Sequence, residues 1–506
     1  MNPNAKIPKG MSFEDNSYTR LLKENLNIQV VYDWTASTSD YDEKMSLCIG
    51  SNTIPEIMNV NATQYRALLK YDMIQPLDKY FDDYASDALK SYVKSGGEEL
   101  QKCITNEDGE LMAIPAPNLT AGGVNEMWIR QDWLDALGLD VPRTWDELAE
   151  VAKAFVTRDP DGNGENDTIG ILGPGNSDHM NAVGGNQFGL DPLFSCFQSY
   201  PQYWLKSEDG SVEYGSIQPE TKTALENISK LYADGVIDPE TLVRSDSKEP
   251  LLAGKVGIFF GPWWCAYTFA DTTLSGSADW RAYFTPLSED GKYYTHMAEP
   301  TTQYVVASKD CKNPEAAFKI INYLVANEQK WVEEGVTSTE MGTGDFYPLY
   351  NTYDNADEIE KSYEALTKYL AGDISMDDVD FSTHKLLKND MEAVTKLKKK
   401  PYDDFSLKYW NLDSDLAKTN LPRLVAIMVG DAPLVNEEYV PVYNAYNGQT
   451  ETMEAKWANL KKMEEETFAK IIMGKADISE FDTFVKNWKN QGGDQILKEI
   501  NDELSK

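Results

Sequence analysis

Oxygen-bearing side chains recur at alternate positions of an Asp- and Gly-rich segment, and this spacing can bind a cation. The donors at loop positions 1, 3, 5, 7 (a backbone carbonyl) and 9 would be Asp159, Asp161, Asn163, Glu165 and Asp167. Calcium takes six to eight oxygens, and a tight loop with glycine at position 6 (Gly164) can wrap them around the ion. Gly170 stands at position 12, where an EF-hand carries a bidentate glutamate, so the loop is EF-hand-like only. We expect a structural calcium ion; an acidic turn without metal is the alternative.

Catalytic motifs are scarce. The three histidines, His179, His296 and His384, lie far apart without an HExxH pair, which disfavours zinc hydrolase chemistry. The sequence contains no GxSxG elbow, Walker A loop or GxGxxG fingerprint. A glycosidase pair cannot be picked out among 83 acidic residues, most of which are expected on the solvated surface. The sequence therefore predicts a binding protein and not an enzyme, with an extracellular carbohydrate-active enzyme as the alternative.

Aromatic residues form the other informative class. An apolar segment at 254–261 ends in Gly-Pro followed by Trp263 and Trp264. Sugars present C–H faces that stack on aromatic rings, so a tryptophan pair at the end of a strand could form a binding platform. Two core aromatics are the alternative, and Trp128 carries the same ambiguity.

Composition limits the classes of partner. The chain has 506 residues, 41% of them apolar, and a net charge of −36. This charge makes nucleic acids and anionic membrane surfaces unfavourable partners. The apolar content predicts folded domains, more than one at this length. Five scattered cysteines without a CxxC pair are expected to be small buried residues.

The first third of the chain alternates short apolar segments with helical ones. We predict strands at 27–34 and 54–60 and a helix at 62–70, and this βαβ rhythm favours a parallel sheet. Ligands bind at the carboxyl ends of such strands, so Asn59 and Asn61 would face a cleft. A simple turn and helix cap is an equal alternative for these two residues.

Later segments carry clear boundary signals. Residues 109–117 end in two prolines and are expected to cross between lobes. Residues 128–138 run from strand into helix and stop at Gly138, and Thr144 with Glu147 has the spacing of a capping box. Beyond about residue 315 the chain is predicted to be mainly helical, with apolar periodicity at 314–327, 457–473 and 481–490.

Several segments, in a shared order, resemble family 1 extracellular solute-binding proteins, the group that contains maltose-binding protein, and especially the LipO- or LplA-like lipoproteins of Firmicutes. The segments are 50–57, 71–78, 113–115, 128–134, 142–147, 159–167, 231–240, 254–257 and 457–493. The resemblance implies an α/β, two-lobed periplasmic-binding-protein-like fold of type II, with mixed sheets flanked by helices and a helical C-terminal extension. It implies that lobe 1 comprises 1–116 and about 296–345, and lobe 2 comprises 117–295 and about 346–506.

The resemblance also implies roles for individual residues. Trp263 matches a sugar-stacking tryptophan, and Asn59 and Asn61 fall where polar contacts of the first lobe lie. The return strand that lines the cleft would carry Gln303 and Tyr304. We expect Trp264 and Trp128 to add aromatic surface and Arg130 to bind the ligand's hydroxyls. The calcium loop resembles that of alginate-type binders, but Thr168 stands where they usually carry an acid.

The implied function is the solute-binding component of an ABC importer, which closes on a carbohydrate, expected to be an oligosaccharide, and is recognised by the permease subunits. A peptide or another small solute, or a calcium-stabilised adhesin, are the alternatives. The chain begins with polar residues, Met1 to Lys6. We expect an extracellular lipoprotein whose signal peptide and anchor cysteine are missing from this chain, so that a lipid anchor would be its only link to the membrane.

Overall fold

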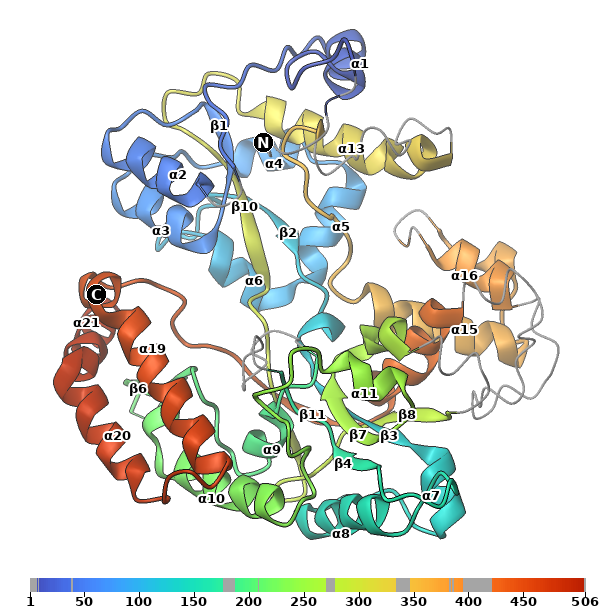
Figure 1. The fold of residues 1–506 in the computed structure, drawn as a ribbon. Coiled ribbons are helices and arrows are strands. Elements are labelled where there is room, and N and C mark those ends of the chain that lie inside the picture. Colours follow the sequence, from blue (N-terminus) through green and yellow to red (C-terminus); the bar gives the residue numbers. More distant parts are fainter. Residues whose placement is uncertain are drawn as a thin grey trace. The chain divides into compact units, whose positions relative to one another are not determined.

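A computed structural model describes residues 7, 9–37, 40–175, 187–207, 209–269, 278–333, 346–381, 384, 386–394 and 421–504. The chain divides into two compact units (Figure 1). Unit 1 comprises Met1–Leu119, Pro300–Glu358 and Asp380–Lys385. Unit 2 comprises Thr120–Glu299, Ile359–Val379 and Leu386–Lys506. Each unit is therefore built from segments that are distant in the sequence, and each is described by itself below.

Unit 1 is organised around a three-stranded sheet of order β1-β10-β2. Strand β1 (Ile57–Val60) and strand β2 (Ile114–Pro117) both pair antiparallel with β10 (Thr301–Ala307). They therefore run in the same direction, separated by the late strand β10. The expected parallel sheet was wrong for these strands, because β10, which begins 184 residues after the end of β2 (Pro117 to Thr301), occupies the place between them.

Helices cover this sheet and enclose the core of unit 1. They are α1 (Ser17–Leu26), α2 (Tyr41–Gly50), α3 (Ala62–Lys70), α4 (Asp78–Tyr84), α5 (Asp87–Ser95), α6 (Gly97–Ile104) and α13 (Glu315–Glu333). The predicted helix at 62–70 is confirmed as α3. The strand expected at 27–34 was wrong, because this segment alternates in exposure but pairs with no strand among the described residues.

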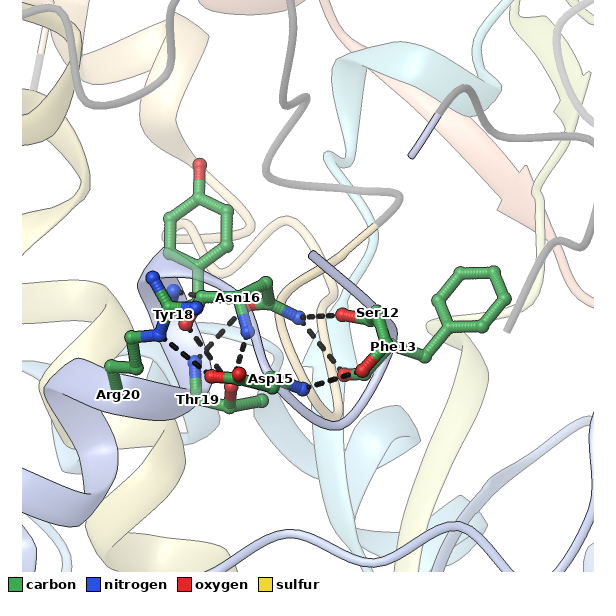
Figure 2. Close-up of polar contacts among 7 residues, drawn as sticks. All are labelled: Ser12, Phe13, Asp15, Asn16, Tyr18, Thr19 and Arg20. Carbon is green, nitrogen blue, oxygen red and sulfur yellow. Dashed lines mark hydrogen bonds and ion pairs between the residues drawn. The ribbon is translucent and has the colours of Figure 1, made fainter. Parts of the chain in front are cut away.

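The first helix of unit 1 begins at a fully buried asparagine (Figure 2). The Oδ1 of Asn16 accepts hydrogen bonds from the backbone N–H groups of Tyr18 at 3.0 Å and Thr19 at 3.1 Å. The Oγ1 of Thr19 accepts the N–H of Asn16 at 2.9 Å, which completes a reciprocal cap. Asn16 Nδ2 also donates to the carbonyls of Ser12 and Phe13. The cap therefore fixes the start of α1, so that Tyr18 packs its ring 5.4 Å from that of Trp331.

Unit 2 contains a four-stranded mixed sheet of order β4-β7-β3-β8. Strand β7 (Val256–Gly261) runs parallel to β4 (Ile169–Ile171) and antiparallel to β3 (Glu126–Arg130), which pairs antiparallel with β8 (Trp280–Tyr283). Every residue of β3 and β7 is buried, as expected of strands covered on both faces. Two smaller sheets are also present: β5 (Trp204–Lys206) with β6 (Val212–Tyr214), and β9 (Tyr293–His296) with β11 (Tyr439–Val442).

The helices of unit 2 before the C-terminal segment flank these sheets. They are α7 (Gln131–Leu137), α8 (Trp145–Thr157), α9 (Asp191–Ser195), α10 (Pro219–Ala233), α11 (Lys248–Leu252), α15 (Glu358–Ala371, which starts at the boundary), α16 (Leu387–Val394) and α18 (Ala432–Asn436). Thr144 and Glu147 form the predicted capping box of α8. Gly138 ends α7 in the left-handed conformation, as the sequence predicts.

The C-terminal segment extends the core of unit 2 (Figure 1). It contains α19 (Glu451–Ile472), α20 (Glu480–Trp488) and α21 (Asp494–Leu504), and α19 packs against both α10 and α20. Trp488 is fully buried and stacks on Tyr214 with ring centroids 4.8 Å apart. The predicted helices at 314–327, 457–473 and 481–490 are confirmed, since they overlap α13, α19 and α20 to within two residues at one end of each. No helix among the described residues is long and apolar enough to cross a membrane.

One acidic side chain is enclosed where this extension meets the rest of unit 2. Glu464 is 1% exposed and accepts hydrogen bonds from the hydroxyls of Tyr214 and Ser216, both at 2.8 Å. Burial raises the pKa of Glu464 to about 7, and the two hydroxyl donors only partly offset that shift. The carboxyl group therefore titrates near neutral pH while it ties α19 to β6 and its flanking turn.

Candidate functional site

Trp263 lies in a short 3₁₀ turn, η3 (Trp263–Cys265), directly after β7. Pro262 separates the strand from the turn, and because proline lacks an N–H it cannot continue the ladder. The indole of Trp263 is 5% exposed, and its Nε1 has no hydrogen-bond partner in the described part of the chain. The ring of Tyr267, 49% exposed, meets it edge-on with centroids 6.5 Å apart. An aromatic pair thus reaches from the interior of unit 2 to its surface.

The turn η3 lies at the end of unit 2 through which the polypeptide enters and leaves. It contacts η1 (Ala121–Gly123), which directly follows the first crossing from unit 1, and Gly123 packs closely on Ala298, just before the return crossing. The turn η3 also contacts a π-helical turn, η6 (Ala426–Gly430). A Cβ atom on Gly430 would lie only 2.7 Å from the carbonyl oxygen of Trp263, so this close approach requires glycine.

Two carboxyl groups lie near this aromatic pair without a partner. Glu126 starts β3 opposite Gly261, and Asp431 follows η6; both are 0% exposed. Among the described residues, none of their four carboxyl oxygens has a hydrogen-bond partner. Burial raises the pKa of Glu126 well above its usual range, and the charges of Asp431 and Glu437 raise it further. Burial also raises the pKa of Asp431, with a contribution from Glu360.

Two arginines near these carboxyl groups, Arg143 and Arg423, already form ion pairs with other acidic residues. Arg423 Nε lies 2.9 Å from Asp390 Oδ1 and 3.0 Å from its Oδ2, and the Arg423 guanidinium also interacts with the side chain of Tyr267. Arg143 forms an ion pair with Glu437 at 2.8 Å. Both of these guanidinium groups are therefore paired with carboxylates other than Glu126 and Asp431.

The structure places the other residues predicted in unit 2 in different surroundings. Trp264 is half-buried beside Trp263. Trp128 is fully buried in the sheet, where its ring stacks on Phe259 with centroids 6.1 Å apart. Arg130 is 4% exposed, forms an ion pair with Asp132 and lies 4.5 Å from the ring centroid of Trp133. Trp128 and Arg130 thus have packing partners that explain their presence without a ligand.

In unit 1, the two predicted asparagines lie at the end of β1. Asn61 caps α3: its Oδ1 accepts the N–H of Gln64 at 2.9 Å, and its Nδ2 donates to Asp42 at 3.1 Å. Asn59 Nδ2 donates to Asn351 Oδ1 at 3.0 Å, whereas its own Oδ1 is buried without a partner among the described residues. Asn61 therefore has the cap role that the sequence offered as an alternative, and Asn59 keeps an unused acceptor.

The return strand β10 carries the remaining predicted residues of unit 1. Tyr304 is 2% exposed and stacks on Tyr65, with ring centroids 4.5 Å apart and an interplanar angle of 10°. Gln303 is half-buried. Of this pair, Gln303 has the more accessible side chain.

The acidic loop of unit 2 is held by hydrogen bonds among its own side chains. Asp159 Oδ1 accepts the N–H of Asn163 at 3.1 Å, and Asp159 Oδ2 accepts that of Gly164 at 3.0 Å. Asn163 Nδ2 bridges Asp161 at 3.0 Å and Asp167 at 3.2 Å. The described residues contain no group of three or more His, Cys, Asp or Glu side chains already gathered around one metal position. A cation would thus require these side chains to turn toward a common centre.

The electrostatics of the loop nevertheless fit a cation. Burial raises the pKa of Asp161, and a hydrogen bond with Asp159 and the charges of Asp159 and Asp167 raise it further. The ammonium of Lys255, 2.8 Å from Asp167, lowers the pKa of that residue. At EF-hand position 12, a Cβ on Gly170 would lie 2.6 Å from the carbonyl oxygen of Val236, so no glutamate fits there. The donor set thus fits a hard cation without the twelfth-position ligand.

Glu126, Asp431, Asp390 and Arg423 were not among the residues predicted for a site. None belongs to a local motif, and the three acids come from segments that are far apart in the sequence. The one available signal was the position of Glu126 two residues before Trp128, in a segment already singled out.

The comparisons with known proteins agree with this architecture. The family described as "Bacterial extracellular solute-binding protein" matches residues 6–331, more than half of the chain. The fructooligosaccharide ABC transporter substrate-binding protein FusA of Streptococcus pneumoniae is 30% identical over 259 residues, 48% of this chain and 45% of that protein. The polygalacturonan/rhamnogalacturonan-binding protein YtcQ of Bacillus subtilis is 24% identical over 469 residues, 90% of this chain and 82% of that protein. The match to FusA thus spans under half of that relative's length.

A solved structure shows the same fold over the full length. The S. pneumoniae FusA EF-hand mutant in complex with fructo-nystose superposes with a TM-score of 0.55 at 19% identity, covering 100% of this chain and 98% of that one. The predicted fold class, with mixed sheets, flanking helices and a helical C-terminal region, is confirmed. The chain belongs to the bacterial extracellular solute-binding proteins.

Proposed function

We propose that this protein is the carbohydrate-binding component of an ABC importer, that its ligand is an oligosaccharide, and that it works by binding without catalysis. The observation that carries the proposal is the aromatic pair Trp263 and Tyr267, bordered by the unpartnered carboxyl groups of Glu126 and Asp431. Rings stack on the C–H faces of sugars, and buried acceptors bind their hydroxyls. The names of FusA and YtcQ support a carbohydrate ligand.

Under this proposal unit 1 contributes Asn59, whose Oδ1 is unused in the described part of the chain, and Gln303. Asn61, Tyr304, Trp128 and Arg130 would support the binding residues, since their side chains already have partners. Closure of the two lobes on the ligand would present one state to the permease subunits. The proposal also includes the lobe boundaries expected from the sequence. It includes an extracellular location with a lipid anchor as well.

A thermal-shift screen tests this function. We expect at least one saccharide among mono- and oligosaccharides to raise the melting temperature, because a ligand at 100 times its Kd adds about 2.7 kcal/mol of stability. Binding should be stoichiometric, with the saccharide recovered unchanged. Short peptides serve as the comparison panel. A shift with peptides and none with saccharides would contradict the carbohydrate proposal.

We further propose that the loop at 159–167 binds calcium as a structural ion, through the carboxylates of Asp159, Asp161 and Asp167, the amide oxygen of Asn163 and the carbonyl of Glu165. The convergence of acids on Asp161 supports this, since a divalent cation would relieve their repulsion. The ion would stabilise the connection between α8 and β4.

Calcium is therefore expected to raise the melting temperature of chelator-treated protein. At 100 times its Kd the gain should be about 2.7 kcal/mol, and Asp161→Asn should remove most of it. The matched control is Asp140→Asn, which removes an exposed acid from the loop before α8. An equal response of wild type and Asp161→Asn to calcium would contradict this site.

A further inference from the structure

The curated relatives are named for glycans of different charge, fructooligosaccharide in one case and polygalacturonan in the other. These classes place different demands on a binding protein. A uronate carries a carboxylate on every unit, which needs a cation or several N–H donors when it is taken out of water. An uncharged sugar carries hydroxyls, which donate hydrogen bonds to acceptor oxygens.

The region around Trp263 supplies acceptors. Glu126 lies opposite Gly261 in the ladder between β3 and β7, and Gly261 is two residues before Trp263 in the sequence. Asp431 directly follows η6, the turn that packs on Trp263. Both side chains are fully buried, and their carboxyl oxygens have no hydrogen-bond partner among the residues that the structure describes. Leaving a buried polar group unsatisfied costs about 1–3 kcal/mol, more for a charged one. Hydroxyl donors from a ligand would remove this cost.

The charges in the same region oppose a uronate. Glu437 adds negative potential at Glu126, and Glu360 adds it at Asp431. Arg143 is paired with Glu437, and Arg423 is paired with Asp390. Arg423 keeps one nitrogen, Nη2, without a partner in the described part of the chain, but its charge is already matched. A uronate carboxylate placed here would therefore find both arginines already paired, in surroundings where burial disfavours the ionised forms of Glu126 and Asp431.

We infer that the ligand is an uncharged, hydroxyl-rich oligosaccharide, whose hydroxyls donate to Glu126 and Asp431 while its C–H faces stack on Trp263 and Tyr267, and that uronate oligomers are rejected. This inference rests on the proposed carbohydrate function. It assigns Glu126 and Asp431 as the residues that determine specificity for ligand charge. Because burial raises the pKa of both carboxyl groups well above the usual range, each is a neutral acid whose carbonyl oxygen still accepts a hydroxyl donor.

Isothermal titration calorimetry tests this at 150 mM salt, where long-range repulsion by the net charge of −36 is largely screened. The probes are uncharged oligosaccharides of two to five units, including kestose, maltotriose and cellotriose, and galacturonate oligomers of the same lengths. The variants are Glu126→Gln and Asp431→Asn, which preserve shape and replace one carboxyl oxygen by an amide NH2 group. Glu438→Gln, an exposed acid close to Asp431 in the sequence, is the matched control.

We expect an uncharged probe to bind wild type and galacturonates not to bind. Glu126→Gln and Asp431→Asn should each weaken binding about 10-fold or more, and Glu438→Gln should change it less than 2-fold. Melting temperatures establish that each variant is folded, and Glu126→Gln suffices if Asp431→Asn does not fold.

The other outcomes overturn the inference in distinguishable ways. Galacturonates that bind as tightly as uncharged probes would refute the rejection of uronates and leave the carbohydrate receptor standing. Unchanged affinity of both folded variants for an uncharged probe would refute the roles of Glu126 and Asp431. If no saccharide of either class binds, the proposed function fails, and this inference fails with it.

Discussion

Trp263→Ala is expected to weaken saccharide binding by about 30-fold or more, because truncating a buried aromatic at the centre of a site typically costs 2 kcal/mol or more. The indole is 5% exposed and holds the inner end of the aromatic pair with Tyr267. Trp263→Phe should retain part of the affinity, since a ring still offers a stacking face. Calorimetric titration of both variants with the best saccharide from the screen measures the effect.

The control for this prediction must separate binding from folding, because Trp263 is also packed. Trp145→Ala removes a different tryptophan of unit 2, which is half-buried and packs edge-on against Phe197 with ring centroids 4.8 Å apart. This variant should lose stability and keep its affinity. A folded Trp263→Ala protein that binds with wild-type affinity would contradict the proposed platform.

Glu464→Gln is expected to change how stability depends on pH between about 4.5 and 7. The folded-state pKa of Glu464 is raised from 4.5 to about 7, so the folded protein holds a proton that the unfolded chain has released. Stability from this group is fully present below pH 4.5 and is lost as the pH rises through 7. The total is about 3 kcal/mol, because each pKa unit corresponds to 1.36 kcal/mol.

The buried side chain of His296 changes the stability in the opposite direction over part of this pH range. His296 is 3% exposed, and burial lowers its pKa to about 3, so its contribution grows as the pH rises from 3 to 6.5. The wild-type curve alone therefore does not isolate Glu464, and the difference between wild type and Glu464→Gln does. Urea denaturation at half-unit steps of pH gives both curves.

Glu466→Gln is the matched control, since it removes an exposed carboxylate from the same helix. Its stability curve should run parallel to that of wild type. If the Glu464→Gln curve also runs parallel to wild type from pH 4.5 to 7, the carboxyl group does not hold a proton at the junction of α19 and β6.

Local signals predicted much of the secondary structure. The capping box at Thr144, the stop at Gly138 and the helices within α13, α19 and α20 depend on neighbours three or four residues apart, which the sequence shows directly. The strand expected at 27–34 failed because strand formation needs a partner. The parallel sheet failed because β10 pairs between β1 and β2. Neither pairing can be read from a local pattern.

The candidate site divides in the same way. Trp263 stood out because a strand, a proline and two tryptophans are adjacent in the sequence, and the loop at 159–167 because its oxygens alternate. The carboxyl groups of Glu126 and Asp431 come from positions about 300 residues apart, and nothing distinguishes them among 83 acids until their burial is known.

The sequence by itself determined the family, the presence of several helices and the elements that could do chemistry, because these depend on residue types at short spacing. Only the tertiary structure decided which of those residues are enclosed and which keep unused hydrogen-bonding groups. It enclosed Trp128 in a sheet, paired Arg130 with Asp132, and left Glu126 and Asp431 without partners in the described part of the chain. Burial and pairing are set by segments that meet only on folding, and these two quantities decide whether a polar side chain stabilises the fold or remains available to a ligand.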